Sequence, residues 1–281
     1  LINVEAARND PNVRIYRNDA VINAERAFEV AITEVYKATR VFEYYTSQTY
    51  APKQELFLTR MVEVGDFNLV SYLTGLQIAF NDFKEVYGNP DTRVAVFSMR
   101  DDVLKIPRVD AKLQARSVED RISDFRAKLA DGSLLDARSH LAFSFATTFE
   151  RLSPLTRNHK ILFVETELVG PGVGDDLARI YLRQSGSSTI QAVGGDKMFY
   201  QFPERVAVLN PFMNGGTDAF VTDTWGGVEI HASYRLRDRP FVNSSWSIAL
   251  NQVDEYENLD IQLSGLDDIR LYVYYTDMTD F

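Results

Sequence analysis

The 281-residue chain is 45% hydrophobic, which is enough to bury the core of one large domain or of two ordinary ones. Its formal net charge is −10, and residues 140–281 carry −8 of this, with 11 lysines and arginines against 19 aspartates and glutamates. Because an acidic surface repels phosphate backbones, we expect no nucleic acid partner. The chain contains no cysteine, which excludes disulfides, thiol catalysis and cysteine-ligated zinc.

No apolar run in the sequence reaches the roughly 18 to 20 residues that a membrane-spanning helix needs. We therefore expect no membrane contact by this region. The chain begins at Leu1 without a basic and then apolar signal segment, which leads us to expect a fragment of a longer protein.

Residues 1–139 are predicted to be mainly helical. Apolar residues recur at three-to-four spacing from about Asp19 to Tyr45, and again from Leu69 to Tyr87, where Asp66 is the predicted N-cap and Gly88-Asn89-Pro90 ends the helix. The link of roughly twenty residues predicts an antiparallel pair. A weaker helix is expected over 118–130, and a short strand near 93–99.

From His140 the apolar period changes from 3.6 to 2, which indicates strands. The alternating segments, separated by turn residues, are 141–146, 162–168, 180–182, 206–208, 228–236, 246–250 and 259–276. The last of these is the most regular, with Ile269, Leu271, Val273 and Tyr275 on one face. The sequence thus predicts an α+β protein, in which N-terminal amphipathic helices (1–139) pack with a C-terminal antiparallel β-sandwich (140–281).

Chemical motifs are sparse, and no catalytic residue, metal site or cofactor is expected. His140, His159 and His231 show no ligand spacing, so structural roles are favoured for all three. The acid pairs Asp101-Asp102 and Asp267-Asp268 are predicted to serve in turns and caps, because adjacent side chains rarely point the same way. The serines lack the frame of a nucleophile elbow. An enzyme is therefore the least expected class.

Two glycine-rich segments are the candidate binding loops. Gly170-Pro171-Gly172-Val173-Gly174-Asp175-Asp176 lacks the helix and lysine of a phosphate loop and the spaced ligands of a calcium site, so a β-turn between paired strands is favoured. The second segment is 212–227. It contains Trp225, which is a candidate for stacking on a sugar, whereas Trp246 alternates with apolar residues and is predicted to lie in the core.

The order of segments resembles the C-terminal region of the A subunit of Tc toxins, the large bacterial insecticidal complexes. The most specific part is Leu266–Thr276, which is similar to a Leu-x-Asp-Ile-x-Leu-x-x-x-Tyr-Thr strand that ends the family's chain. Weaker similarities lie at 96–100, 158–161, 168–171 and 178–182. The sequence departs from the family at Arg157-Asn158, where the family has Pro-Gly, at Lys160, where it has arginine, and in the added tail 277–281.

The resemblance implies a non-enzymatic docking domain that binds the cocoon-forming B-type subunit and opens it onto the translocation channel. It also implies a secreted bacterial protein and a homo-oligomeric ring. Because loops at one end of a sandwich commonly carry function, the candidate partner-binding residues are Gly170, Pro171, Gly172, Asp175, Asp176, Phe212 and Trp225. Two alternatives remain open: a carbohydrate-binding β-sandwich module, and a structural subunit of a phage-tail-like injection assembly.

Overall fold

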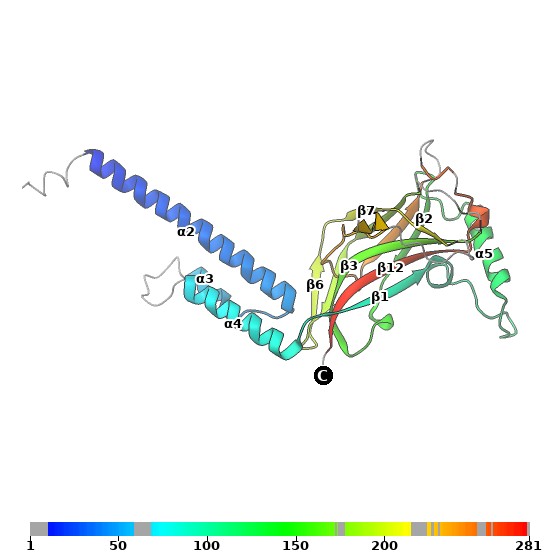
Figure 1. The fold of residues 1–281 in the computed structure, drawn as a ribbon, viewed down its shortest axis with the longest axis horizontal. Coiled ribbons are helices and arrows are strands. Elements are labelled where there is room, and N and C mark those ends of the chain that lie inside the picture. Colours follow the sequence, from blue (N-terminus) through cyan, green and yellow to red (C-terminus); the bar gives the residue numbers. More distant parts are fainter. Residues whose placement is uncertain are drawn as a thin grey trace, which may run out of the picture. The chain divides into compact units, whose positions relative to one another are not determined.

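The computed structural model describes residues 11–58, 69–171, 173, 178–214, 224–225, 228–229, 231–251, 257–259 and 261–279 (Figure 1). The chain divides into two compact units between Gly88 and Asn89. Helices make up the described part of the first unit, and the second is rich in β-strands, so the predicted α+β class is confirmed. No helix in the described part of the chain is long and apolar enough to span a bilayer.

The described helices of the first unit are α2 (Pro11–Thr46), α3 (Lys53–Leu58) and α4 (Leu69–Tyr87). The hydroxyls of Thr39 and Tyr72 are hydrogen-bonded at 2.8 Å, and the ring of Tyr45 packs on those of Phe80 and Phe83. Later residues of α4 thus lie beside later residues of α2, and the two helices run in the same direction (Figure 1). The predicted antiparallel arrangement is wrong, because the link between the helices contains α3 and is long enough to return along α2.

The second unit contains two four-stranded sheets. The first sheet has the order β1 (Asp91–Ser98), β12 (Asp268–Thr279), β3 (Thr156–Val169) and β8 (Phe212–Asn214). The second has the order β2 (Leu141–Ala146), β11 (Ser245–Leu250), β4 (Ile180–Ser185) and β7 (Arg205–Leu209). Pairing within them is antiparallel, except that β3 and β8 run parallel. This parallel pair departs from the predicted all-antiparallel arrangement.

The remaining described elements are two ribbons and four helical segments. The ribbons are β5 (Ser187–Gln191) with β6 (Lys197–Gln201), and β9 (Thr224–Trp225) with β10 (Val228–Glu229). The helical segments are the π-helical turn η1 (Met99–Val103), α5 (Val118–Ala130) and the 3-10 turns η2 (Phe149–Arg151) and η3 (Leu263–Gly265).

One apolar core lies between the two sheets. Leu271 and Val273 of β12 belong to the same buried cluster as Phe143 of β2 and Ile248 of β11. The predicted inward face of β12 is confirmed, because its residues 269, 271, 273 and 275 are at most 5% exposed. The prediction that Trp246 lies in the core is also confirmed, at 2% exposed.

Residues 89–139 pack with the sheets, although the sequence grouped them with the helical region. β1 pairs with β12 along its whole length, from Asp91 opposite Asp277 to Ser98 opposite Arg270. Phe125 of α5 is fully buried in the same core. The compact unit therefore begins about fifty residues before the change in periodicity at His140, because a strand and a helix from the earlier region complete the sandwich.

Two strand predictions differ from the structure, and one hairpin was missed. β7 buries Ala207 and Leu209, whereas Val208, on the predicted inner face, is 52% exposed. The predicted strand 228–236 forms strand only at Val228–Glu229 among its described residues, and 234–239 forms turns with Leu236 buried. The β5–β6 hairpin was not predicted.

Candidate functional site

The two candidate loops leave the first sheet from neighbouring strands. β3 and β8 pair in parallel, with Glu167 opposite Phe212 and Val169 opposite Asn214. Strands that run in the same direction end at the same edge of a sheet. Gly170 directly follows β3, and the second candidate segment, 212–227, opens with β8 and continues from its end, so the chain leaves both strands at one end of the sandwich.

The start of the first loop touches η3 through the backbone. The amide of Asp267 donates to the carbonyl of Val169 at 2.7 Å. Gly170 has φ of 146°, and a Cβ there would collide with the carbonyl oxygen of Gly265. A Cβ at Gly265 would lie 2.7 Å from the carbonyl oxygen of Pro171. Glycine is required at both positions, because a Cβ at either one would collide with the backbone of the other segment.

The first loop does not turn between paired strands, as the sequence predicted. β3 belongs to the first sheet and β4 to the second, so the segment between Gly170 and Ile180 crosses from one sheet to the other. The predicted β-turn is therefore wrong at this point, since both strands find their partners elsewhere.

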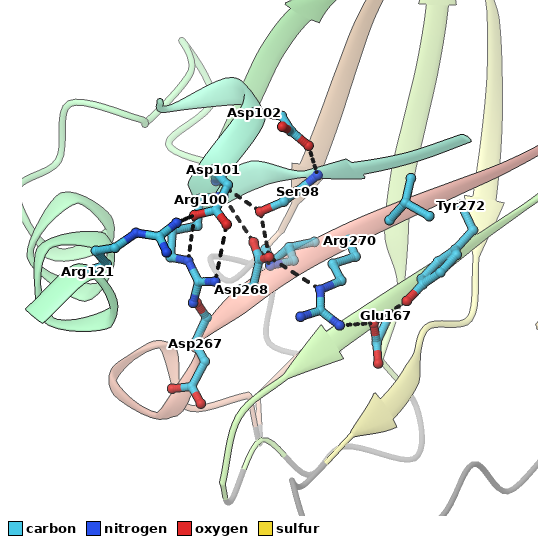
Figure 2. Close-up of polar contacts among 12 residues, drawn as sticks. Ser98, Arg100, Asp101, Asp102, Arg121, Glu167, Asp267, Asp268, Arg270 and Tyr272 are labelled. Atoms are coloured by element: carbon cyan, nitrogen blue, oxygen red, sulfur yellow. Dashed lines mark hydrogen bonds and ion pairs between the residues drawn. The ribbon is translucent and has the colours of Figure 1, made fainter. Parts of the chain in front are cut away.

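Asp268, at the start of β12, is the centre of a polar network at this end of the sandwich (Figure 2). Its carboxylate accepts the hydroxyl of Ser98 at 2.6 Å and the backbone amide of Arg100 at 3.0 Å. Burial raises the pKa of Asp268, and the hydrogen bonds from Ser98 and Arg100 offset only part of this rise. The carboxylate thereby joins the end of β1 to the start of β12.

Arginines connect α5 and η1 to the same network (Figure 2). Arg100 Nε donates to Asp101 Oδ1 at 2.9 Å, and Arg121 of α5 binds the same carboxylate oxygen. Burial alone would raise the pKa of Asp101, but the hydrogen bonds from Arg100 and Arg121 outweigh it and lower the pKa. Arg126 of α5 donates to Asp267 Oδ1 at 2.6 Å. Asp101 and Asp267, one from each acid pair, are thus both bound by arginines at this end of the sandwich.

Glu167 of β3 forms a second group of contacts on the face of the first sheet opposite the core. Its carboxylate accepts the hydroxyl of Tyr272 at 2.6 Å and Arg270 Nη1 at 3.2 Å, both from β12 (Figure 2). Burial and the hydrogen bond to Glu167 raise the pKa of Tyr272 to about 12. The ring of Phe212 packs against Tyr272 at 5.7 Å and against His231 at 6.0 Å. Phe212 is therefore a packing residue on this sheet face as well as a candidate contact.

The structure describes only some of the seven candidate residues. Gly170 and Pro171 lie at the exit of β3, Pro171 is exposed, and Phe212 begins β8. Trp225 is part of β9, but its side chain lies outside the described part of the structure. Gly172, Asp175 and Asp176 lie outside the described residues.

Two of the three histidines, His159 and His231, make contacts within the fold. His159 is 1% exposed, and its Nε2 is hydrogen-bonded to the hydroxyl of Thr156 at 2.9 Å. Burial lowers the pKa of His159 to about 4. His231 Nδ1 lies 2.9 Å from the carbonyl oxygen of Asn210. Among the described residues, no group of three or more His, Asp or Glu could hold a metal ion.

Sequence reasoning missed the basic and hydroxyl members of the network. Ser98 lies in a predicted strand, Arg100 directly follows it, and Arg121 lies on the predicted third helix. Glu167 was the one available signal, since an acid within a strand of alternating apolar residues needs a partner when it is buried. Its partners, on β12, are more than one hundred residues away.

Comparisons with known proteins give little further identification. No family model and no curated protein matches the chain. A chain in the cryo-EM structure of Yersinia pseudotuberculosis TcaA-TcaB has a TM-score of 0.36 and 13% sequence identity over 75% of this chain. The match covers 11% of that chain, so this chain spans about a tenth of its length. The likeness is weak and by itself defines neither a family nor a partner.

Proposed function

We propose that this chain is a non-enzymatic docking domain of the A subunit of a secreted bacterial toxin complex, and that it holds the cocoon-forming B-type subunit on the translocation channel. The observation that carries the proposal is the parallel pairing of β3 and β8, which starts both candidate loops at one end of the sandwich. The sequence resemblance supports the proposal independently. Most of the Leu266–Thr276 motif lies in β12, the strand between β1 and β3.

The polar network gives this end of the sandwich a fixed frame. Asp101, Asp268 and Glu167 are each paired with at least one arginine or a hydroxyl donor, and each is largely shielded from solvent. Carboxylates held in this way position loops, whereas a general acid or base has to reach a substrate. The arrangement therefore favours binding over catalysis.

The assembled toxin would present several copies of this domain around the channel. The acidic charge of residues 140–281 would repel neighbouring copies at close range, so we propose a ring in which the sandwiches are spaced apart. The same charge disfavours nucleic acid as a partner.

The direct test is association with a B-type subunit of a toxin complex. Purified chain and B-type subunit would be mixed at micromolar concentration and separated by size exclusion, with a pulldown as a second readout. A stable complex is expected. Failure of the two proteins to associate would refute the proposal.

A loop variant locates the interface. Asp175→Ser and Asp176→Ser would be combined in one variant, which leaves the required Gly170 and the buried Val173 in place. As a control, Asp196→Ser changes an exposed acid in the turn between β5 and β6. Weaker B-subunit binding is expected for the first replacement alone; equal losses in both would place the interface elsewhere.

A further inference from the structure

The outer face of the second sheet is hollowed over β2 and β11. Ser144 lies opposite Ser247, and Ala142 lies opposite Ala249, where β2 pairs with β11. None of these four side chains belongs to the buried core, and all four line a cavity of about 600 Å³. Small residues on two neighbouring strands leave a floor that lies lower than the flanking side chains.

Larger polar side chains form the walls of this cavity. Tyr181 and Arg183 of β4 lie next to Ala249 and Ser247 in the register of the sheet. Arg138 and His140, from the turn before β2, line the cavity as well. The cavity thus combines a floor of methyl and hydroxyl groups with walls that carry hydrogen-bond donors.

Glu257 supplies an acceptor in the same cavity. The hydroxyl of Tyr181 donates to Glu257 Oε1 at 2.6 Å. Glu257 Oε2 is shielded from solvent and has no hydrogen-bond partner among the described residues. A shielded carboxylate oxygen without a partner is costly, and a donor from a ligand would satisfy it once the Glu257 side chain turns toward the cavity.

The charges in the cavity select a neutral ligand. Charged side chains of the lining already have partners of opposite charge, so the cavity offers no excess of either sign. Arg183 pairs with Glu204 at 3.1 Å, and Glu257 pairs with Arg179 at 3.8 Å. An uncharged ligand that both donates and accepts hydrogen bonds could bind the arginines as well as the carboxylates of the lining.

The sheet itself disfavours an extended peptide on this floor. The backbone of β11 is hydrogen-bonded to β2 on one side and to β4 on the other. Beyond β2, the amide of Ala142 donates to the carbonyl of Leu134 at 2.8 Å. A peptide strand adds to a sheet through free backbone groups at an edge, and the cavity lies on the face instead.

We infer that this cavity binds a neutral saccharide. Its hydroxyl groups donate to Glu257 Oε2 and accept from Arg138 and the serine hydroxyls, and its C–H face rests on the methyl groups of Ala142 and Ala249. None of the described residues that line the cavity lies at the exit of β3 or of β8. This site does not depend on the proposed docking function.

The test begins with the full chain on a glycan microarray that carries neutral and acidic oligosaccharides. We expect binding to at least one neutral glycan, whose affinity is then measured by isothermal titration. Ser247→Tyr fills the floor and is expected to abolish this binding. Val94→Tyr, a matched change at an exposed position of the first sheet, is expected to leave it unchanged.

Arg138→Ala serves as the second variant. Arg138 is exposed, so the change leaves the fold intact, and the loss of one charged hydrogen bond is expected to weaken binding about tenfold. If Ser247→Tyr does not fold, the glycan affinity of Arg138→Ala tests the inference in its place. Absence of any bound neutral glycan, or binding to acidic glycans alone, would overturn the inference. Binding that survives in Arg138→Ala but is lost in Trp225→Ala would overturn it as well.

Discussion

Replacing Asp268 by Ala is expected to destabilise the sandwich strongly. The carboxylate accepts the hydroxyl of Ser98 and the buried backbone amides of Arg100 and Ile269, so the change takes the acceptor away from three donors. Each orphaned buried donor costs about 1–3 kcal/mol, and removing one member of a buried charged group costs about 3–5 kcal/mol. We therefore expect a loss of about 4 kcal/mol from the free energy of unfolding.

Chemical denaturation followed by tryptophan fluorescence measures this loss, because Trp246 lies in the core that unfolding exposes. A loss of about 4 kcal/mol is a large part of the roughly 5–15 kcal/mol that stabilises an ordinary domain. The melting temperature should fall by roughly 8–16 °C, at about 2–4 °C per kcal/mol for a unit of this size.

Two variants control for the loss of charge and of volume. Asp268→Asn keeps an acceptor oxygen for the Arg100 amide, and the neutral form is tolerated because burial already raises the pKa of Asp268. We expect it to lose less than half as much stability as Asp268→Ala. Asp91→Ala, at a side chain 66% exposed on β1, should change the free energy of unfolding by under about 0.5 kcal/mol. If Asp268→Ala matched Asp91→Ala, the network would not be what joins β1 to β12.

Three further changes test other parts of the chain. His159 is buried with its pKa lowered from 6.5 to about 4, so wild-type stability should fall by about 3 kcal/mol as the pH drops from 6.5 to 4, and denaturation curves of His159→Gln should lack most of this fall. Leu271→Asp places an unpaired carboxylate in the core and should yield insoluble protein, whereas Thr276→Asp, on the other face of β12, should express as folded protein. Phe42→Ala, at 7% exposed, should cost the helical unit about 3–5 kcal/mol, and limited proteolysis should cleave it well before Phe28→Ala, at 43% exposed. A flat pH profile, a soluble Leu271→Asp protein, or equal cleavage of the two phenylalanine variants would each contradict the corresponding placement.

Elements with a local cause could be predicted from the sequence. The third helix was predicted at its observed bounds, since Ser117 caps it by accepting the amide of Asp120 at 3.0 Å and Gly132 follows it with φ of 74°. β12 was likewise predicted with the correct face inward. In both cases the periodicity needed no information from distant residues.

Elements whose local pattern fits two arrangements could not be predicted. β7 contains four consecutive apolar residues, from Val206 to Leu209, so the sequence does not show which of them face the core. The packing of β7 on β4 decides which pair is buried. The segment 228–236 alternates as a strand would, but its Leu236 is buried from a turn, with the amide of Arg239 donating to the Leu236 carbonyl at 3.2 Å. An apolar residue at every second position is thus compatible with a compact turn that buries a single residue, Leu236, against the core.

The polar network depends on one strand pairing that no local pattern indicates. In an antiparallel pair, the end of one strand lies beside the start of the other. Because β1 ends at Ser98 and β12 begins at Asp268, the acids and basic groups just outside these ends are brought together once the two strands pair. Arg126 then fixes η3, the turn on which Gly170 packs, through its hydrogen bond to the carbonyl of Gly265 at 3.3 Å. The strand with the most regular sequence pattern therefore also positions the first of the two candidate docking loops.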